Sequence, residues 1–193
     1  MAAVVHIRKE ALLIMIWAAA EMFKKECMGV IFGDTPSPSR DYFWVSDAIP
    51  FQGIKRRLNT EVVQSELSNS RWNMFWDRLG SHPKRLGTFH SHPEWGSHRP
   101  PSEMSEEDTK DMRKQKSPLE IIVCISSRRK GSYLPWEPLE DGSIRGSLAI
   151  FNFQINAFTL VGEGDGIEPT RIRIVSTAAL RKLNRVQQRK NQT

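Results

Sequence analysis

Residues 119–126, LEIIVCIS, form a nearly continuous apolar run of strand length. A short run of this kind, rich in β-branched residues, is typical of a strand that is buried on both faces. It therefore predicts a central strand. Strand-like sequence lies on both sides of it: KRLGTFHSH at residues 84–92, and SIRGSLAIFNFQINAFTLVGE at residues 143–163, which suggests a hairpin or a long bent strand.

Outside this centre, some segments have the apolar pattern of a strand and others that of a helix, and turn-rich loops separate them. Further strands are expected at AVVHIRK (3–9), ECMGVIFG (26–33), DYFWVSDAIPF (41–51), NTEVVQSE (59–66) and RIRIV (171–175). Helices are expected at about 10–25, 68–80, 103–115 and 176–193. We see no internal repeat and no linker in the 193 residues. The sequence predicts one α/β domain with a strand-rich middle and peripheral helices.

The overall composition is that of a soluble globular protein, with 39% apolar and 26% charged residues. The net charge of +6 would suit an acidic partner. Basic runs at 55–57, 127–131 and 180–190 raise the alternative of a nucleic-acid-binding module. Such runs are more often solvated faces, and no nucleic-acid recognition motif accompanies them. We therefore do not expect nucleic acid as a partner; the same cations could meet an acidic protein or serve oligomerisation.

Two features bear on the compartment. Cys27 and Cys124 each lie in an apolar run, which predicts small buried side chains in a reducing, cytoplasmic setting. The segment ALLIMIWAAAEMF, residues 11–23, is too short to span a bilayer. Its WAAA could mimic a signal-peptide cleavage site, but Glu10 precedes the run and strand-like sequence follows it. A buried helix is favoured, with no membrane association.

The stretch GTFHSHPEWGSHRPPSEMSEED, residues 87–108, carries the polar chemistry of the chain. On a strand, His90 and His92 project to the same face, so the two imidazoles can bind one metal ion. Asp108, in the first turn of the following helix, can face back toward the strand end as a third ligand. Ser105 lies three residues earlier on the same helical face, where it can also act as the N-cap. The two roles of this turn are compatible.

Taken together, these residues resemble the signature of the JAMM (MPN+) family of zinc isopeptidases. The family has a His-x-His-Pro pair, a gap, then Ser-x-x-Asp, with a glutamate far upstream before a strand. HSHP at 90–93, Ser105-Glu-Glu-Asp108 and Glu26 in KKECMGVIFG match in that order, within a region from about Val4 to Ile125. The gap of eleven residues is longer than the commonest form. In a shorter register Glu103 and Ser102 would compete for the two roles, but only Ser105 and Asp108 preserve Ser-x-x-Asp.

The resemblance implies a fold and a domain organisation. The fold class is α/β: a single MPN (JAMM, cytidine-deaminase-like) domain, with a central mixed β-sheet flanked by helices. The catalytic domain would take residues 1–175. Residues 176–193 would form a basic C-terminal helix and tail.

The resemblance also implies a mechanism. His90, His92 and Asp108 would hold Zn²⁺, and a water would complete the tetrahedron. Glu26, which is not a ligand, would accept the water proton and pass it to the leaving amine. Ser105 would donate a hydrogen bond to the oxyanion.

The substrate implied by the resemblance is ubiquitin or a ubiquitin-like protein, cleaved at a peptide or isopeptide bond at its C-terminus. One alternative is a processing protease for a ubiquitin-like sulfur-carrier protein, and another is a non-catalytic MPN scaffold that only binds partners. An activating partner protein or a homo-oligomer would be compatible with either activity. Trp95 could line a groove for an extended peptide or cover the core, and His98 is a solvated loop residue or a substrate contact.

Overall fold

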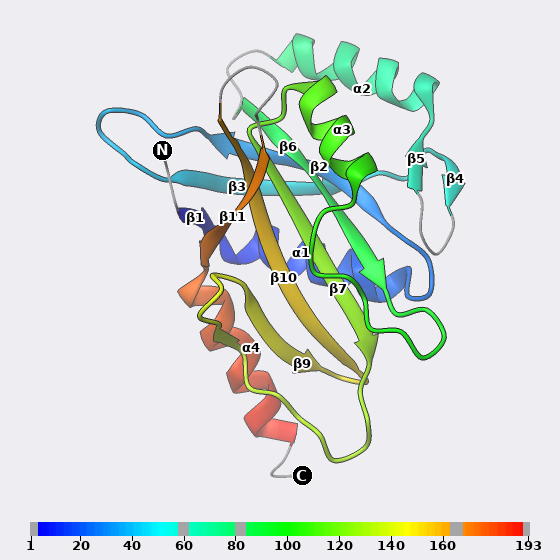
Figure 1. Ribbon diagram of the computed structural model, residues 1–193, viewed down its shortest axis with the longest axis vertical. Helices are drawn as coiled ribbons and strands as arrows, with labels where there is room; N and C mark the ends of the chain where they lie inside the picture. Colours follow the sequence, from blue (N-terminus) through cyan, green and yellow to red (C-terminus); the bar gives the residue numbers. More distant parts are fainter. Residues whose placement is uncertain (1–3, 58–61, 80–83, 163–167, 191–193) are drawn as a thin grey trace.

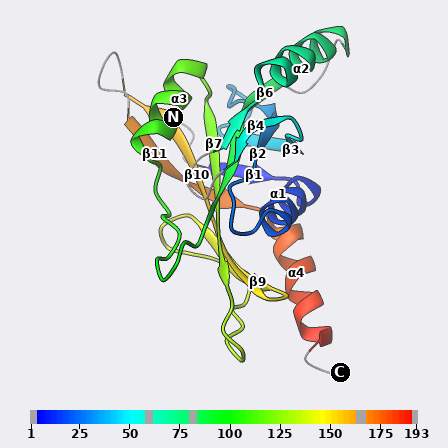
Figure 2. The same ribbon diagram turned by 90° about the vertical axis from the view of Figure 1, so that its right-hand side faces the viewer.

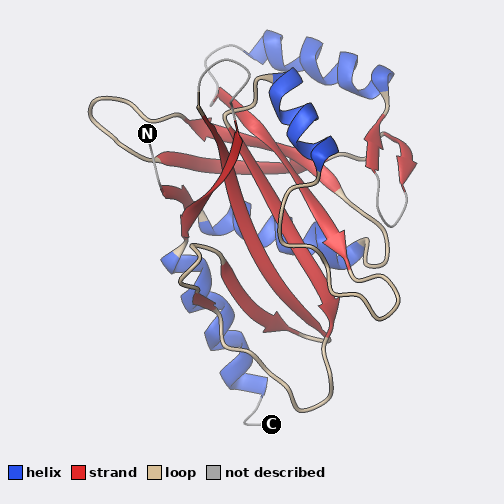
Figure 3. Ribbon diagram, viewed as in Figure 1, coloured by secondary structure: helices blue, strands red, loops and turns tan. Residues whose placement is uncertain are grey.

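Strands dominate the computed structural model, which describes residues 4–57, 62–79, 84–162 and 168–190 (Figure 1). The described elements are β1 (Val4–Ile7), α1 (Lys9–Glu21), β2 (Met28–Asp34), β3 (Phe43–Pro50), β4 (Ile54–Arg57), β5 (Val62–Gln64), α2 (Glu66–Leu79), β6 (Lys84–Pro93), α3 (Glu106–Gln115), β7 (Leu119–Ser127), β8 (Glu137–Pro138), β9 (Ile144–Leu148), β10 (Phe151–Val161), β11 (Glu168–Val175) and α4 (Thr177–Lys190). Helices lie around the strands rather than alternating with them (Figure 3).

Most of the predicted elements match these bounds within a few residues. Of the strand expected at 59–66, residues 59–61 lie outside the described part of the chain, and β5 takes Val62–Gln64. The run LEIIVCIS becomes β7, which pairs with β6 on one side and β10 on the other, so its central position is confirmed. Residues 144–161 form a hairpin of β9 and β10, as suggested for this stretch. No strand was predicted between residues 51 and 59, where the structure has β4, which pairs with β5 in a separate two-stranded sheet.

The predicted fold class is wrong. The expected MPN-type α/β arrangement is a central mixed sheet with flanking helices, whereas this sheet closes on itself. Its strand order is β11-β1-β3-β2-β6-β7-β10, and β10 pairs again with β11. The result is a closed mixed barrel of seven strands, extended at β10 by β9 and β8. In this closed sheet, each of the seven strands has a neighbour on both sides over at least part of its length.

Closure depends on the length of β10 and on the last strand of the chain. The first part of β10, Phe151–Ile155, pairs with β9, and its second part, Ala157–Val161, pairs with β11. The other side of β11 pairs in parallel with β1, and β1 in turn pairs in parallel with β3. These contacts join the two ends of the chain, a kind of pairing that no local pattern in the sequence reveals.

The two faces of β6 and β7 meet different surroundings. Because alternate side chains of a strand point to opposite faces, one set of β7 residues joins the main core with α1, while Ile122 and Cys124 join a smaller cluster with Phe158 and Met104 on the other face. Figure 2 shows α3 on one side of these strands and α1 on the other. The face toward α3 is the one that carries His90 and His92.

The helix α1 contributes six buried residues to the main core: Ala11, Leu12, Met15, Ile16, Ala18 and Ala19. The expectation of a buried helix here is confirmed. None of the described helices is long and apolar enough to cross a membrane. The C-terminal helix α4 packs beside α1 and adds Ala179 and Leu183 to the same core.

A glycine allows β6 and β7 to approach closely at the start of their parallel pairing. A Cβ atom built on Gly87 would lie 1.8 Å from the carbonyl oxygen of Leu119. Any side chain at this position would therefore push the two strands apart. The pairing that begins with Gly87 and Leu119 sets the register for every residue of the site that follows on β6 and β7.

Candidate metal centre

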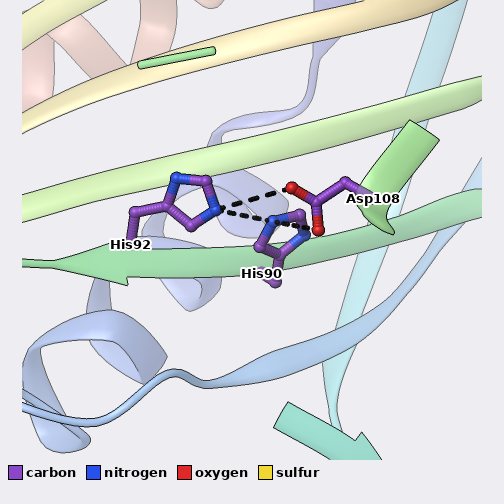
Figure 4. A group of neighbouring side chains, drawn as sticks. All are labelled: His90, His92 and Asp108. Carbon is purple, nitrogen blue, oxygen red and sulfur yellow. Dashed lines mark hydrogen bonds and ion pairs between the residues drawn. The ribbon is translucent and has the colours of Figure 1, made fainter. Parts of the chain in front are cut away.

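The strand β6 presents His90 and His92 on one face, two residues apart (Figure 4). Both imidazoles are buried, with 7% of each residue exposed. The strand is held between β2 and β7, which fixes the face from which the two side chains project. The predicted common face of the two histidines is confirmed.

The helix α3 carries Asp108 to the same place from the opposite side. Ser105 is the N-cap of this helix: its Oγ accepts a hydrogen bond from the Asp108 backbone N–H (3.0 Å), and the Ser105 N–H donates to Asp108 Oδ2 (2.8 Å). This reciprocal pair is a capping box, which fixes both the first turn and the rotamer of Asp108. The Ser105 hydroxyl also donates to Asp108 Oδ2 at 2.7 Å. The other oxygen, Oδ1, faces His90, while Oδ2 is the oxygen on the side of His92.

Three side chains thus meet in one group. The Nε2 atoms of His90 and His92 lie 3.0 Å apart, and the Asp108 carboxylate oxygens lie 3.4 Å from His90 Nε2 and 3.8 Å from His92 Nε2. Nitrogen and oxygen ligands bound about 2.0–2.2 Å from one tetrahedral ion are separated by roughly 3.3–3.5 Å. The observed separations bracket that value. His90, His92 and Asp108 could therefore bind a metal ion.

The other nitrogen of each ring is already engaged. His92 Nδ1 lies 2.8 Å from the carbonyl oxygen of Pro101, and His90 Nδ1 lies 3.0 Å from Glu120 Oε1. A carbonyl or carboxylate oxygen accepts, so both Nδ1 atoms carry a proton, and Nε2 is the atom of each ring that is left to bind a metal ion. The two Nε2 atoms lie 3.0 Å apart, a distance at which a proton or a cation between them is favourable.

The electrostatics of the metal-free group reflect this arrangement. Burial by itself lowers the pKa of His90, but hydrogen bonds to Asp108 and Glu120, with their charges, outweigh it and raise that pKa to about 10. Burial and the neighbouring His90 charge lower the pKa of His92 to about 4. Burial opposes ionisation of Asp108, yet its contacts with His90 and Ser105 hold its pKa well below the ordinary value. Without a metal ion, these pKa values favour a protonated His90 between a neutral His92 and an ionised Asp108.

Glu26 reaches the same cavity through strand register. The antiparallel pairing of β2 and β6 places Met28 opposite His90. One residue further, the Cys27 N–H donates to Ser91 Oγ and the Ser91 N–H donates to the Cys27 carbonyl, both at 2.9 Å. Glu26 therefore lies opposite His92 and lines the cavity with it, and only 8% of the residue is exposed.

The cavity has a volume of about 470 Å³ and contains all of the predicted site residues. Ser105, Trp95 and His98 line it, and the Trp95 ring is stacked on that of His98 with centroids 6.2 Å apart. Trp95 is 59% exposed, which excludes the reading that it covers the core. Its neighbour His98 shares this open rim.

The competing residues are engaged elsewhere. Glu103 lines the cavity but forms an ion pair with Arg171, whose guanidinium also donates to the Ser102 carbonyl at 3.1 Å. Neither residue lies with the histidines, which Asp108 joins instead. Cys124 is buried with the pKa of its thiol raised to about 12 by that burial, as expected for a small core residue.

Sequence reasoning missed Glu120, Thr88 and Arg171. Glu120 lies within the apolar run 119–126, and a carboxylate inside a central strand needs a buried partner. That signal was available in the sequence, although the identity of the partner was not. Arg171 carried no local signal, because its contacts with residues 102–103 span about 70 positions of the chain.

The fold and the site together define a closed β-barrel protein with a candidate metal centre between a barrel strand and a helix. The sequence matches no protein-family model and no curated protein. Among solved structures, it is similar to a solution structure of a protein from Desulfitobacterium hafniense. The identity is 18%, the match covers 89% of this chain and 93% of that chain, and the TM-score is 0.48. Similarity at this level defines neither a family nor a function.

Proposed function

We propose that this protein is a zinc-dependent hydrolase of amide bonds, acting at the C-terminus of ubiquitin or a ubiquitin-like protein. The observation that carries the proposal is the pair of Nε2 atoms that face each other at 3.0 Å, with the Asp108 carboxylate beside them and Glu26 on the wall of the same cavity. The motif residues that resemble the JAMM family are all present at this place.

The donor set fits zinc. Two imidazoles and one carboxylate are ligands that Zn²⁺ accepts, and three protein ligands leave one position open, as in hydrolytic zinc sites. When bound, zinc supplies Lewis acidity and lowers the pKa of a bound water to about 7. Two histidines and a carboxylate also suit non-haem iron(II), so identification of the metal is part of the test.

Glu26 is the group we assign to proton transfer. Its carboxylate belongs to the cavity lining, and its backbone is fixed through the paired hydrogen bonds of Cys27 with Ser91. In this role Glu26 accepts the proton of the attacking water and returns it to the leaving amine nitrogen. Such transfer typically contributes about 10²–10⁴-fold to the rate.

Ser105 has two uses in this proposal. Its hydroxyl holds Asp108 Oδ2 in the capping box, which keeps the third ligand in place. For the same hydroxyl to donate to a developing oxyanion, it must turn from Asp108 toward the substrate. The capping box then keeps one of its two bonds, because the Ser105 backbone N–H still donates to Asp108 Oδ2.

The rim of the cavity is suited to a polypeptide substrate. The exposed Trp95 ring, stacked on His98, offers a flat amphipathic surface beside the candidate metal centre. A narrow C-terminal tail could pass over it and bring its terminal amide bond to the ligands. A ubiquitin-like sulfur-carrier precursor would present the same kind of tail and is the alternative substrate.

The test uses a panel of ubiquitin-like proteins fused through their C-termini to a reporter, incubated with and without a chelator. We expect stoichiometric zinc, chelator-sensitive cleavage by the wild type, and loss of cleavage in Glu26→Gln with zinc retained. Glu107→Gln is the matched control, because Glu107 is an exposed carboxylate that lines the same cavity. Its activity should stay within about twofold of the wild type, as for a solvated charge.

Three outcomes would contradict the proposal. Cleavage that survives removal of the metal would exclude the metal-dependent mechanism, and iron in place of zinc would change the reaction class. Zinc-loaded wild type that cleaves no fusion in the panel would instead favour a domain that only binds partners.

A further inference from the structure

Glu120 is a buried carboxylate that the proposed reaction does not use. It lies on the central strand β7 and is 5% exposed. A carboxylate taken out of water is unfavourable by several kcal/mol unless it is paired and hydrogen-bonded. A buried carboxylate on this strand therefore needs specific partners that stabilise it.

Its partners are two residues of β6. Thr88 Oγ1 donates to the carboxylate, with 2.8 Å to Oε1 and 2.7 Å to Oε2, and His90 Nδ1 lies 3.0 Å from Oε1. In the parallel pairing of β6 with β7, Thr88 is the direct partner of Glu120. Thr88 and His90 are two residues apart and project to the same face. The contact is thus fixed by strand register rather than by a flexible loop.

We propose that Glu120 is a positioning residue of the metal centre. It accepts the Nδ1 proton of His90 and so directs the lone pair of Nε2 toward the metal ion. Burial raises the pKa of Glu120, and its hydrogen bonds with His90 and Thr88 oppose that rise. The ionised carboxylate makes the imidazole a stronger ligand, and Thr88 holds it in the orientation that this requires. Carboxylate–histidine–metal relays of this kind commonly tune metal sites. The inference rests on the metal-binding half of the proposed function and not on the hydrolytic step.

The two histidines are supported unequally. His92 Nδ1 donates to the neutral carbonyl of Pro101 at 2.8 Å, which fixes its tautomer without adding charge. His90 donates to a carboxylate that is buried with it. A charged acceptor strengthens the hydrogen bond and the basicity of the ring. Loss of Glu120 should therefore weaken the hold on the metal ion, although Glu120 does not touch the ion.

The experiment measures the zinc affinity of the metal-free protein by competition with a chromophoric chelator. Glu120→Gln keeps the shape and an acceptor oxygen for His90 but removes the charge. We expect its zinc affinity to fall about 10- to 100-fold, the usual range for outer-shell partners. Thr88→Val removes the hydroxyl that orients the carboxylate and should give a smaller loss. Glu107→Gln makes the same chemical change on the exposed wall of the cavity and should change the affinity less than about twofold.

A second readout separates positioning from a merely structural role. In the zinc-loaded wild type, nitrogen-15 NMR of the His90 ring should show a proton on Nδ1 and metal coordination through Nε2. In Glu120→Gln the Nδ1 proton signal should move upfield, because its hydrogen bond is weaker. The His92 signals should stay unchanged, which a general loosening of the fold would not allow.

The outcomes are distinct. Wild type that binds no zinc ends the proposed function and this inference together. Wild type that binds zinc while Glu120→Gln binds it as tightly overturns the inference alone, as does coordination through His90 Nδ1. If Glu120→Gln does not fold, Thr88→Val decides the question, since an unchanged zinc affinity in that variant would also overturn the inference.

Discussion

At the scale of single residues, the candidate centre is defined by which ring nitrogens are already engaged. His90 and His92 each donate from Nδ1, to Glu120 and to Pro101, so their Nε2 atoms are directed at a common point. Spacing in the sequence predicted the two histidines and Asp108, because the period of a strand and the first turn of a helix are local properties. The Nδ1 acceptors depend on pairing between distant segments and were not predictable from those patterns.

Zinc binding should release a proton and tighten as the pH rises. With the pKa of His90 raised to about 10, the metal-free protein keeps a proton on His90 throughout the neutral range. Zinc must displace it, so the apparent affinity should rise about tenfold per pH unit between roughly pH 7 and 9. With its pKa lowered to about 4, His92 adds nothing to this slope. Competition titrations at pH 7, 8 and 9 measure the slope, and a flat profile would contradict it.

Asp108 should have separable roles in binding metal and in stabilising α3. Asp108→Ala removes both, so it should lose stoichiometric zinc and also lower the free energy of unfolding of the metal-free protein by about 1 kcal/mol. Asp108→Asn keeps one oxygen for the Ser105 bonds and should recover part of that stability without recovering full zinc affinity. Urea unfolding of the metal-free variants, with zinc content measured in parallel, distinguishes the two effects. Full zinc occupancy in Asp108→Ala would remove it from the ligand set.

At the scale of elements, the site forms where β2, β6 and β7 lie side by side beneath α3. Apolar patterns predicted the three strands well, whereas α3 was predicted from its N-cap and the order of its charges. Glu26 could be assigned only by resemblance, but register explains its position: Met28 pairs with His90, and Cys27 is bonded to Ser91 in both directions. Ser91 lies between the two histidines on the opposite face, so one strand supports both the candidate metal ligands and the segment that carries Glu26.

Ser91→Ala should reduce catalysis without loss of zinc. Ser91 is fully buried and accepts the Cys27 N–H, so the variant leaves that donor unsatisfied at a cost of about 1–3 kcal/mol. The segment that carries Glu26 should then shift, which lowers kcat on the best fusion substrate of the panel. Ser46→Ala is the control, because its hydroxyl donates to the Phe32 carbonyl from a neighbouring strand. Equal losses of kcat in both variants would argue against a specific role of Ser91.

At the scale of the whole molecule, the barrel is the feature that local reasoning could not supply. Apolar patterns predicted where the strands of the ring lie in the sequence, but not which strands pair. Closure depends on β11, which pairs with β10 on one side and with β1 on the other. From β11, the guanidinium of Arg171 also reaches Glu103, Asp141 and the Ser102 carbonyl. The strand that shuts the barrel thus also holds the segment that leads into α3.

Arg171→Met should loosen that segment. We expect the free energy of unfolding to fall by about 1 kcal/mol, since Glu103 and Asp141 are partly exposed and solvent screens their charges. Hydrogen exchange should become faster in residues 102–108, and zinc affinity should fall severalfold. Arg173→Met is the matched control, an exposed arginine two positions along the same strand. Unchanged exchange in residues 102–108 would show that Arg171 does not anchor them.

The place of β11 in the ring also determines when the barrel can close during synthesis of the chain. All of the candidate zinc ligands are synthesised by residue 108, but the ring cannot shut until residues 168–175 have left the ribosome. Until then, the backbone N–H and C=O groups that β11 would pair, on β1 and on the second half of β10, stay unpaired and can pair with other nascent chains. Chains that stall before this strand would therefore carry the candidate metal ligands on an open sheet with unpaired edges. Such chains should be prone to aggregation and should be bound by chaperones or degraded.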